Sequence, residues 1–452
     1  MSKTLSNSKQ ADAQAYFDSL PGFEVKAEDI DVLNSPKEYH QKILELIKKT
    51  KKRIYLSLLY IENDEAGNEI LEKLFQKKEE NSEIDIQLFI DHHRAQRGRS
   101  DHPKDNGILP VIEALKKDIP EEKQLSVTTV QIAKTEGKGV FHPKGMVFDD
   151  TLLYSGASIS NKYCHVGDEL RLDTYVLFEN TPKLANSFVE QMQVDFRANA
   201  GKILDSLEGF SSPEKTERNE DSVLVTPLIG KNSKSEVNEA MLNALKVAKE
   251  KITFYTPYFN LPEPLKEKIR ETLNIGCKEQ IVVGDKKAND WWLPPEQWKE
   301  TTNNGFKDLN KFKFKSASMQ LLGRTLPFFY EQQLKDFAKS FSKEIKDGLL
   351  KISLWKNGKN STHTKRLEID DKKIVILTGS NMNKRSWDTD LENAIVLQNL
   401  PQNLKKKFEK EQQSILENTE TITSPEYIPN IKDYPRLARQ GIRIFNVKQK
   451  KI

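Results

Sequence analysis

One short pattern occurs twice in this chain, and the repetition restricts the fold more than any other feature of the sequence. The segments HPKGMVFDD (142–150) and HTKRLEIDD (363–371) both place histidine, lysine and aspartate in the order H-x-K-x4-D. His102 serves as an internal control: a lysine follows it at the same distance, but Leu109 stands where the aspartate should be. Two full matches among seven histidines exceed what chance would give at this composition. The sequence therefore predicts two copies of one structural unit.

The hydrophobic pattern around the two motifs supports a tandem duplication. A capped helix beginning at Ser35 precedes a β-rich run at 53–60, a helical stretch and a strand that ends at Asp91, which is the order of a βαβ unit. The same order returns as a helix at 235–250, a strand at 251–259, a helix at 261–273 and a strand ending at Asp285. We expect an α/β fold of two tandem α/β/α sandwich domains related by a pseudo-two-fold, with the active site at their interface. The expected boundaries are 22–208 for the first domain, 209–222 for a linker, 223–425 for the second domain and 426–452 for a basic C-terminal segment.

The placement of the motif lysines suggests a site for a charged substrate. Residues two apart on a strand share a face, so His142 and Lys144 should point with apolar residues, and Arg366 and Glu368 should lie on the opposite, charged face. A lysine that only decorated the surface would belong on the charged face. An ammonium on the apolar face needs an anion to offset its desolvation.

Paired histidines and lysines fit phosphoryl transfer. One imidazole can attack phosphorus, a second can protonate the leaving oxygen, and two lysines can stabilise the charge that develops. The candidate catalytic residues are His142, Lys144, His363, Lys365, Asp173 and Glu392, where each of the two acids could accept an imidazole N–H. The candidate hydrogen-bond donors to substrate after the motifs are Ser158, Asn161, Ser380, Asn381 and Asn383. We interpret Asp149 and Asp370 as structural residues, because they fall on the other strand parity or in a turn.

Composition excludes several classes of protein. No apolar run approaches the length of a spanning helix, and the N-terminus lacks the apolar core of a signal peptide. Two cysteines, Cys164 and Cys277, cannot form a disulfide framework, which favours a reduced cytosolic chain. No histidine or cysteine cluster has zinc-like spacing, so no metal and no other cofactor is expected.

The doubled H-x-K-x4-D pattern, followed by glycine and small polar residues, resembles the phospholipase D superfamily. Within it the chain is similar to the family of bacterial CDP-diacylglycerol–serine O-phosphatidyltransferases, on the segments SPKEYHQKILELI, HHRAQRG, DDTLLYSGAS, VTPLIG, TPYFNLP, VGDKKAND, LENAI and DYP. The resemblance covers about Ser35 to Pro435. It departs from the superfamily pattern in the first half, where Ser160 stands at the place that Asn383 fills in the second.

The resemblance implies phospholipase D-like domains, the substrates CDP-diacylglycerol and L-serine, and CMP as a product. His142 would be the nucleophile and His363 the acid and then the base, although pseudo-symmetry leaves this order open. TPYFNLP brings Tyr258 and Asn260 among the substrate-binding candidates. Arg94, Arg97 and Lys286 follow strand-ending aspartates at the edge where α/β sheets bind ligands, so we expect them to contact the diphosphate. Solvated loop charge is the alternative for all three.

A substrate with two acyl chains requires contact with a membrane surface. The second half is longer between its strand-ending aspartate and its motif, which predicts a membrane-facing insertion near 291–350. The candidate membrane-binding residues are Trp291, Trp292, Leu326, Phe328, Phe329, Arg436, Arg439 and Arg443. Buried core aromatics and a solvated tail are the alternative. Peripheral association with anionic phospholipid at the inner face of the cell membrane is the expected location, and the sequence leaves homo-oligomer formation open.

Other functions are less well supported. A cardiolipin synthase or phospholipase D has the same motifs, but the cardiolipin synthases of the superfamily usually begin with spanning helices. A nuclease or nucleic-acid-binding protein is disfavoured by a net charge of only +4 over 452 residues. A catalytically inactive scaffold is disfavoured by two intact motifs.

Overall fold

Two mixed sheets lie side by side and are built on the same strand order. The computed structural model describes residues 2–97, 107–211, 222–294, 296, 298 and 311–449. The first sheet has, in spatial order, β2 (Ile30–Leu33), β9 (Tyr175–Phe178), β7 (Thr151–Ser155), β6 (Gly145–Phe148), β3 (Arg53–Leu58), β4 (Asp85–Asp91) and β5 (Ser126–Val130). The second has β1 (Phe23–Lys26), β10 (Ser222–Lys231), β17 (Leu391–Gln398), β16 (Ile374–Thr378), β15 (Arg366–Ile369), β11 (Lys251–Thr256), β12 (Lys278–Gly284), β13 (Leu350–Trp355) and β18 (Thr419–Ile422).

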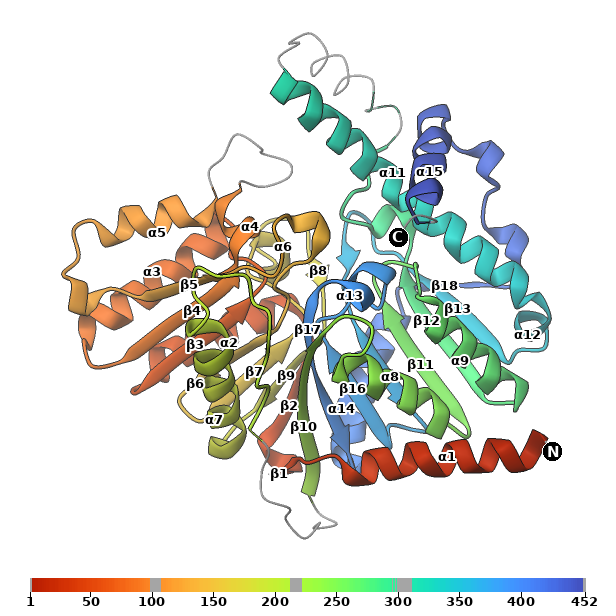
Figure 1. The fold of residues 1–452 in the computed structure, drawn as a ribbon, viewed down its shortest axis with the longest axis horizontal. Coiled ribbons are helices and arrows are strands. Elements are labelled where there is room, and N and C mark those ends of the chain that lie inside the picture. Colours follow the sequence, from red (N-terminus) through yellow and green to blue (C-terminus); the bar gives the residue numbers. More distant parts are fainter. Residues whose placement is uncertain are drawn as a thin grey trace.

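The internal repeat predicted from the sequence is confirmed by the pairing of these strands. β3, β4 and β5 are parallel neighbours, as are β11, β12 and β13. The strands on the other side of β3 and of β11 run antiparallel in both sheets. Each half therefore has the topology of the other, with β1 and β18 added at the edges of the second sheet (Figure 1).

Helices cover the outer faces of both sheets and fill the space between them. The first half contains α2 (Pro36–Lys49), α3 (Glu65–Glu80), α4 (His92–Gln96), α5 (Ile108–Lys116), α6 (Asn161–Cys164) and α7 (Pro182–Gln191), which η4 (Met192–Arg197) continues. The second half contains α8 (Glu236–Val247), α9 (Glu263–Asn274), α11 (Lys311–Ser340), α12 (Ser342–Lys346), α13 (Lys384–Asp388), α14 (Gln402–Leu416) and α15 (Arg436–Gln449), and α1 (Ser2–Ser19) packs on it. One hydrophobic core joins residues of both sheets with α7 and α14, so the halves form a continuous body. No helix within the described ranges is long and apolar enough to cross a membrane.

Local sequence signals account for the helix starts. The side chain of Ser35 accepts a hydrogen bond from Glu38 N, and Pro36 occupies the first helical position of α2, as the sequence predicts. Asp64 caps α3 and Asp91 caps α4 in the same way. The Asp91 cap therefore fixes how α4, which carries Arg94, leaves the end of β4.

The predicted domain boundaries need one correction. Residues 23–26 were assigned to the first domain, but β1 pairs antiparallel with β10 in the second sheet, and Phe23 and Val25 are buried in the shared core. Hydrogen bonding and burial therefore place this strand with the second half. Most of the predicted linker, 212–221, lies outside the described residues, and β10 already begins at Ser222.

The prediction that the motif histidines lie on strands is also corrected. β6 begins at Gly145 and β15 at Arg366, so each histidine and lysine stands in the extended segment just before its strand. The face of β15 that carries Arg366 and Glu368 was expected to be charged and solvated, but it is buried. Arg366 is fully buried, contacts Glu368 at 2.8 Å and Glu411 of α14 at 2.7 Å, and stacks on Tyr255. Because α14 covers this face, both faces of the motif strand are buried.

Candidate active site

The first motif is held against a strand of the second half. Phe141 forms a parallel bridge with Leu391 of β17, and His142 N donates to Leu391 O at 3.0 Å. Lys144 N donates to the side-chain oxygen of Asn393 at 2.8 Å, and the Asn393 amide donates back to Lys144 O at 2.7 Å. These bonds place His142 beside the residue between Leu391 and Asn393, which is Glu392.

The second motif is held by the first half in the reciprocal way. β14 (Ser361–Thr362) pairs with β8 (Arg171–Leu172), and His363 N donates to Leu172 O at 2.6 Å. The residue that directly follows β8 is Asp173. Each histidine is therefore positioned by the other half, beside that half's carboxylate.

His142 pairs directly with Glu392. Its Nδ1 lies 2.7 Å from Glu392 Oε2, and the histidine is 5% exposed. Burial, followed by the charges of Lys144 and Lys365, holds the pKa of His142 well below its usual value. The imidazole is therefore neutral at pH 7. When Glu392 is ionised it accepts a hydrogen bond from Nδ1–H, so the lone pair of Nε2 stays free.

His363 has a different set of neighbours at the equivalent atom. Lys365 Nζ lies 2.5 Å from its Nδ1, and Tyr163 OH lies 3.0 Å from the same atom. Asp173 Oδ2 is farther away, at 3.6 Å. Burial and Lys365 lower the pKa of His363 well below its usual value. Because an ammonium can only donate, Nδ1 accepts and the single proton of this neutral ring lies on Nε2.

The two motif lysines also differ in how well they are paired. Lys365 Nζ donates to Asp173 Oδ2 at 2.8 Å and to His363 O at 2.6 Å. Lys144 is fully buried, and its Nζ has one hydrogen bond among the described residues, to His142 O at 3.0 Å. Burial lowers the pKa of Lys144 to about 7. An anion placed between the histidines would give this ammonium the counter-ion that it lacks.

A glycine after each motif makes room for the lysine of the other half. A Cβ on Gly156 would lie 2.5 Å from Lys365 Cε, and a Cβ on Gly379 would lie 3.2 Å from Lys144 Cγ. A side chain at Gly156 would force Lys365 to move, whereas one at Gly379 would crowd Lys144 and the His142 carbonyl by only a few tenths of an ångström. Close approach across the interface therefore requires glycine at 156 more strictly than at 379.

The polar residues after the motifs are placed less uniformly. Ser158 and Ser380 are buried, and the Ser380 hydroxyl accepts from Met382 N. The side chains of Asn161 and Asn383 serve helix ends: Asn161 accepts from Ala66 N, and Asn383 forms a capping box at α13. Asn381 differs, because its side-chain oxygen is buried with no hydrogen-bond partner in the described chain. Asn381 therefore keeps a buried acceptor oxygen for a ligand that can donate a hydrogen bond.

Asp149 and Asp370 have matching contacts at equivalent sites. Asp149 accepts from the backbone N–H groups of Lys51, Lys52 and Arg53 at the start of β3. Asp370 accepts from the three residues 249–251 at the start of β11. Both aspartates thus join the turn after the motif strand to the start of the neighbouring strand.

Arg94 and Arg97 point at a carboxylate rather than at bulk solvent. Arg94 Nε lies 2.9 Å and Arg97 Nη2 lies 3.3 Å from the same oxygen of Glu136. Glu136 belongs to η3 (Glu136–Lys138), and its backbone oxygen accepts from Arg385 of α13. Asp91 connects this cluster to the motif, since it caps the turn before Arg94 and accepts from Phe141 N at 2.8 Å. The arginines form a basic subsite whose counter-ion is the protein's own glutamate.

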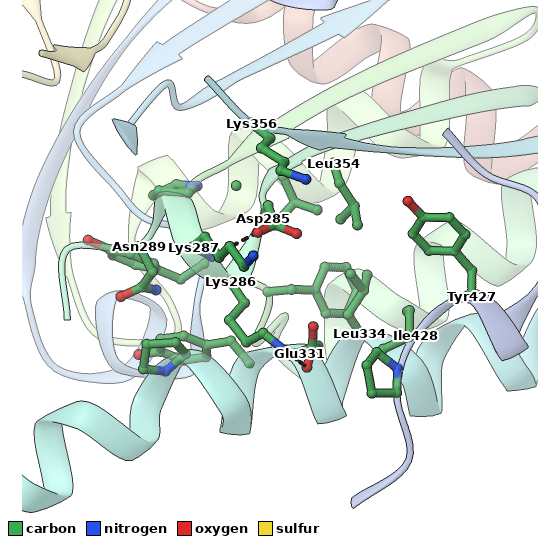
Figure 2. Close-up of a pocket in the computed structure, with 18 residues that line it drawn as sticks. Asp285, Lys286, Lys287, Asn289, Glu331, Leu334, Leu354, Lys356, Tyr427 and Ile428 are labelled. Atoms are coloured by element: carbon green, nitrogen blue, oxygen red, sulfur yellow. Dashed lines mark hydrogen bonds and ion pairs between the residues drawn. The ribbon is translucent and has the colours of Figure 1, made fainter. Parts of the chain in front are cut away.

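Lys286 lines a separate cavity of about 200 Å³ in the second half (Figure 2). Its Nζ pairs with Glu331 of α11 at 2.8 Å, and the rings of Phe328 and Tyr434 lie 5.1 and 5.5 Å away. These contacts tie η5 (Lys286–Ala288) to α11 and to the segment before α15. Tyr258 lines the same cavity and also packs edge-on against His363, with ring centroids 5.5 Å apart. The backbone oxygen of Asn260 accepts from Lys384 N, which connects TPYFNLP to α13.

The membrane assignment of two aromatic residues is corrected by their burial. Phe328 and Phe329 are each 2% exposed and form a small core between α11 and α15 with Trp298, Tyr434, Ala438 and Ile442. Trp292 packs against that core, and Trp291 lies against Gly323 of α11. Helix packing accounts for these rings, which leaves the polar face of α15 with Arg436 and Arg443 exposed and Arg439 half-buried, and Leu326 half-buried on α11.

Sequence reasoning missed an ion pair next to His363. Arg171 Nη2 and Asp290 Oδ1 lie 2.7 Å apart, and Tyr258 OH donates to the other Asp290 oxygen at 2.6 Å. Tyr163, which contacts His363, was missed as well. The only signals available were that Arg171 precedes Asp173 by two residues and that Asp290 ends VGDKKAND.

Comparison with known proteins gives matches over almost the whole chain. A family model described as "Cardiolipin synthase, PLD-like domain" matches residues 241–416. A CDP-diacylglycerol–serine O-phosphatidyltransferase from Haemophilus influenzae is 33% identical over 96% of this chain and 95% of its own. One from Escherichia coli is 32% identical over 97% and 96%. The crystal structure of phosphatidylserine synthase from Haemophilus influenzae superposes with a TM-score of 0.85, at 30% identity, over 98% of both chains.

Proposed function

The chain belongs to the family of CDP-diacylglycerol–serine O-phosphatidyltransferases in the phospholipase D superfamily, and we propose how its residues carry out that reaction. The substrates are CDP-diacylglycerol and L-serine, and the products are phosphatidylserine and CMP, in phospholipid biosynthesis. The transfer runs through a phosphatidyl group bound covalently to His142. The observation that carries the proposal is the unequal environment of the two Nδ1 atoms, one facing a carboxylate and one facing donors.

The first step forms the covalent intermediate. His142 Nε2 attacks the phosphorus of the phosphatidyl group, and the bond from phosphorus to the CMP oxygen breaks. His363 gives its Nε2 proton to that oxygen while Lys365 Nζ passes a proton to His363 Nδ1, so the ring stays neutral, and CMP leaves. The phosphorylated His142 ring is cationic, so the Glu392 carboxylate on its Nδ1–H stabilises it. Lys144 supplies positive charge to the nonbridging oxygens during the transfer, and Lys365 adds its charge until its proton has moved to His363.

The second step returns both histidines to their starting state. His363 Nε2 now takes the proton from the serine hydroxyl while its Nδ1 returns a proton to Lys365, and the serine oxygen attacks phosphorus. The bond between phosphorus and His142 breaks, and its electron pair returns to Nε2. One proton has moved from serine to His363 and replaces the proton lost with CMP.

CMP release from CDP-diacylglycerol in mixed micelles, measured with and without L-serine, tests the proposal. Serine should increase the rate and should appear in phosphatidylserine, identified by mass spectrometry. CMP release that yields cardiolipin with added phosphatidylglycerol, and no phosphatidylserine with serine, would favour a cardiolipin synthase instead.

We also propose that Arg94 and Arg97 bind the diphosphate of the nucleotide. Support comes from their shared position after β4 and from Glu136, a carboxylate that occupies the place of an anionic ligand between them. Binding would exchange Glu136 for phosphate oxygens. Replacing both arginines by alanine should weaken CMP binding at least tenfold, whereas Glu136→Gln, which removes the competing charge, should leave it equal or tighter. Equal weakening in both variants would mean that Glu136 only positions the arginines.

We propose that the outer face of α15 docks the enzyme on anionic phospholipid. This face carries exposed Leu437 (39%) and Ile444 (47%), each directly after an exposed arginine, Arg436 and Arg443, and α15 stands with α11 at one end of the molecule (Figure 1). Each arginine near an anionic surface contributes about 1 kcal/mol before screening. Changing Leu437 and Ile444 to serine should reduce binding to anionic vesicles, while Ile275→Ser, a change at an equally exposed apolar residue outside α15, should not. Unchanged binding at low and high salt would exclude this face.

A further inference from the structure

The ion pair between Arg171 and Asp290 lies beside His363 but has no part in the two transfer steps. Arg171 is on β8 of the first half, and Asp290 follows η5 of the second half. Their side chains are 13% and 19% exposed, so the charges are mostly shielded but can be reached by a small molecule. Neither residue lines the cavity of Figure 2, but two of their neighbours do: Asn289, which precedes Asp290 in the chain, and Tyr258, which donates a hydrogen bond to Asp290.

Two tyrosines connect the pair to the catalytic imidazole. Tyr258 donates to Asp290 Oδ2 at 2.6 Å, and its ring meets the His363 ring edge-on. The guanidinium of Arg171 lies 5.0 Å from the centre of the Tyr163 ring, and Tyr163 OH lies 3.0 Å from His363 Nδ1. Each charge of the pair is therefore one aromatic side chain away from the group that takes a proton from the acceptor.

The first half and the second motif together fix the orientation of Arg171. Its Nε donates to Ser361 Oγ at 3.3 Å, on β14 just before His363. Burial alone would raise the pKa of Asp290, but the charge of Arg171 and the hydrogen bond from Tyr258 outweigh it and keep the pKa below its usual value. Both groups are thus held ionised in fixed positions. A buried ion pair adds little stability over an apolar contact, so stability alone gives a weak reason for keeping it here.

We propose that Arg171 and Asp290 form the subsite for the acceptor, in which Arg171 binds the carboxylate and Asp290 the ammonium of an α-amino acid. This deepens the proposed function and rests on it. In the empty site each group is the counter-ion of the other. A zwitterion carries both opposite charges and can replace that mutual pairing without leaving either charge alone.

The same exchange explains selection against other hydroxyl compounds. An acceptor with only an ammonium or only a carboxylate satisfies one partner and leaves the other buried and unpaired, which is costly. Water and glycerol satisfy neither charge. The subsite therefore favours L-serine over ethanolamine, 3-hydroxypropionate and water, and places the serine hydroxyl toward His363.

Variants at the pair test the assignment through two partial reactions. Exchange of labelled CMP into CDP-diacylglycerol needs only the first step, whereas phosphatidylserine formation needs both. Asp290→Asn and Arg171→Gln should lower the ratio of serine transfer to CMP exchange at least tenfold, mainly through a higher KM for serine. Glu169→Gln, which removes an exposed ion pair with Lys162 in the same part of the first half, is the control and should leave that ratio unchanged.

Acceptor analogues separate a subsite from a simple contact between the halves. Asp290→Asn should lose most of the preference for serine over 3-hydroxypropionate, which lacks the ammonium. Arg171→Gln should lose most of the preference for serine over ethanolamine, which lacks the carboxylate. A structural contact would lower exchange and transfer together and would leave both preferences intact, and that result would overturn the proposal.

The unaltered protein provides a test that does not depend on folding of the variants. L-alanine, a zwitterion without the hydroxyl, should compete with L-serine, and propionate and ethylamine at the same concentration should not. Competition by none of the three, or equally by all three, would contradict the subsite. Absence of CMP exchange in the unaltered protein would instead refute the proposed function itself.

Discussion

The two halves carry the same motif, yet the two histidines have opposite partners at Nδ1. In the first site a glutamate reaches the imidazole, at 2.7 Å. In the second site the residue at the equivalent position is Asp173, which is one methylene shorter; it binds Lys365 and stays 3.6 Å from His363. A carboxylate fixes a proton on Nδ1, and an ammonium fixes it on Nε2. The difference in side-chain length thus gives a symmetric fold one histidine suited to attack and one suited to donate a proton.

The largest effect should come from removing the histidines one at a time. His142→Ala and His363→Ala should each reduce phosphatidylserine formation by about 10³-fold or more. A phosphatidyl ester of p-nitrophenol separates their roles, because its leaving group departs without a proton. With this ester, His363→Ala should release p-nitrophenol at a rate close to that of the unaltered enzyme. His142→Ala should remain slow, because it lacks the nucleophile. The opposite pattern would reverse the assignment of nucleophile and acid.

The carboxylates should give the next largest effect, and an unequal one. Glu392→Gln keeps the shape but removes the charge that holds the Nδ1 proton and stabilises the phosphorylated ring, so we expect a loss of about 10²-fold in kcat. Asp173→Asn removes the counter-ion of Lys365 and should reduce kcat by about tenfold. Burial and the nearby Asp390 raise the pKa of Glu392 well above its usual value, so activity should fall at acid pH as this carboxylate takes up a proton. This acid limb should be absent in Glu392→Gln. If both variants lost the same fraction of kcat and kept the pH profile of the unaltered enzyme, Glu392 and Asp173 would have equivalent roles.

The lysines should differ in how their contribution depends on pH. Burial lowers the pKa of both lysines, but Lys365 has Asp173 as a counter-ion that opposes the effect, whereas the pKa of Lys144 falls to about 7. Above pH 7 Lys144 is therefore mostly neutral in the empty site, and it must take up a proton when the CMP anion binds. CMP affinity should fall by up to about tenfold per pH unit above 7. Calorimetry in buffers of different ionisation enthalpy should detect proton uptake at pH 8, and Lys144→Gln should abolish it. Uptake that persists in Lys144→Gln would assign the proton to another group.

The sequence predicted what the repeat contains but not how its copies meet. The βαβ order, the duplicated sheet and the buried motif lysines followed from periodicity and residue type. The crossed pairing of His142 with Glu392 could not follow, because it depends on how two separately folded halves dock. Arg366 was expected on a charged face and is buried, since α14 covers the back of its strand. Phe328 was expected at a membrane and lies in a core, because an aromatic residue near an insertion suits either place equally well.

The smallest effect should come from the one part of the motif that the halves use identically. Asp149 and Asp370 each accept three backbone N–H groups at the start of an equivalent strand, and neither contacts a catalytic side chain in the hydrogen bonds of the described residues. Asn at either position keeps one acceptor oxygen and loses the other, which should reduce the free energy of unfolding by about 1–2 kcal/mol. Guanidinium unfolding should show similar shifts for Asp149→Asn and Asp370→Asn, with turnover per folded molecule retained. The neighbouring exposed residues provide matched controls, and Asp150→Asn and Asp371→Asn should change stability little. A large loss of turnover without a change in stability would mean that these aspartates have a chemical role. A loss in only one of the two variants would mean that the halves also differ in this part of the motif.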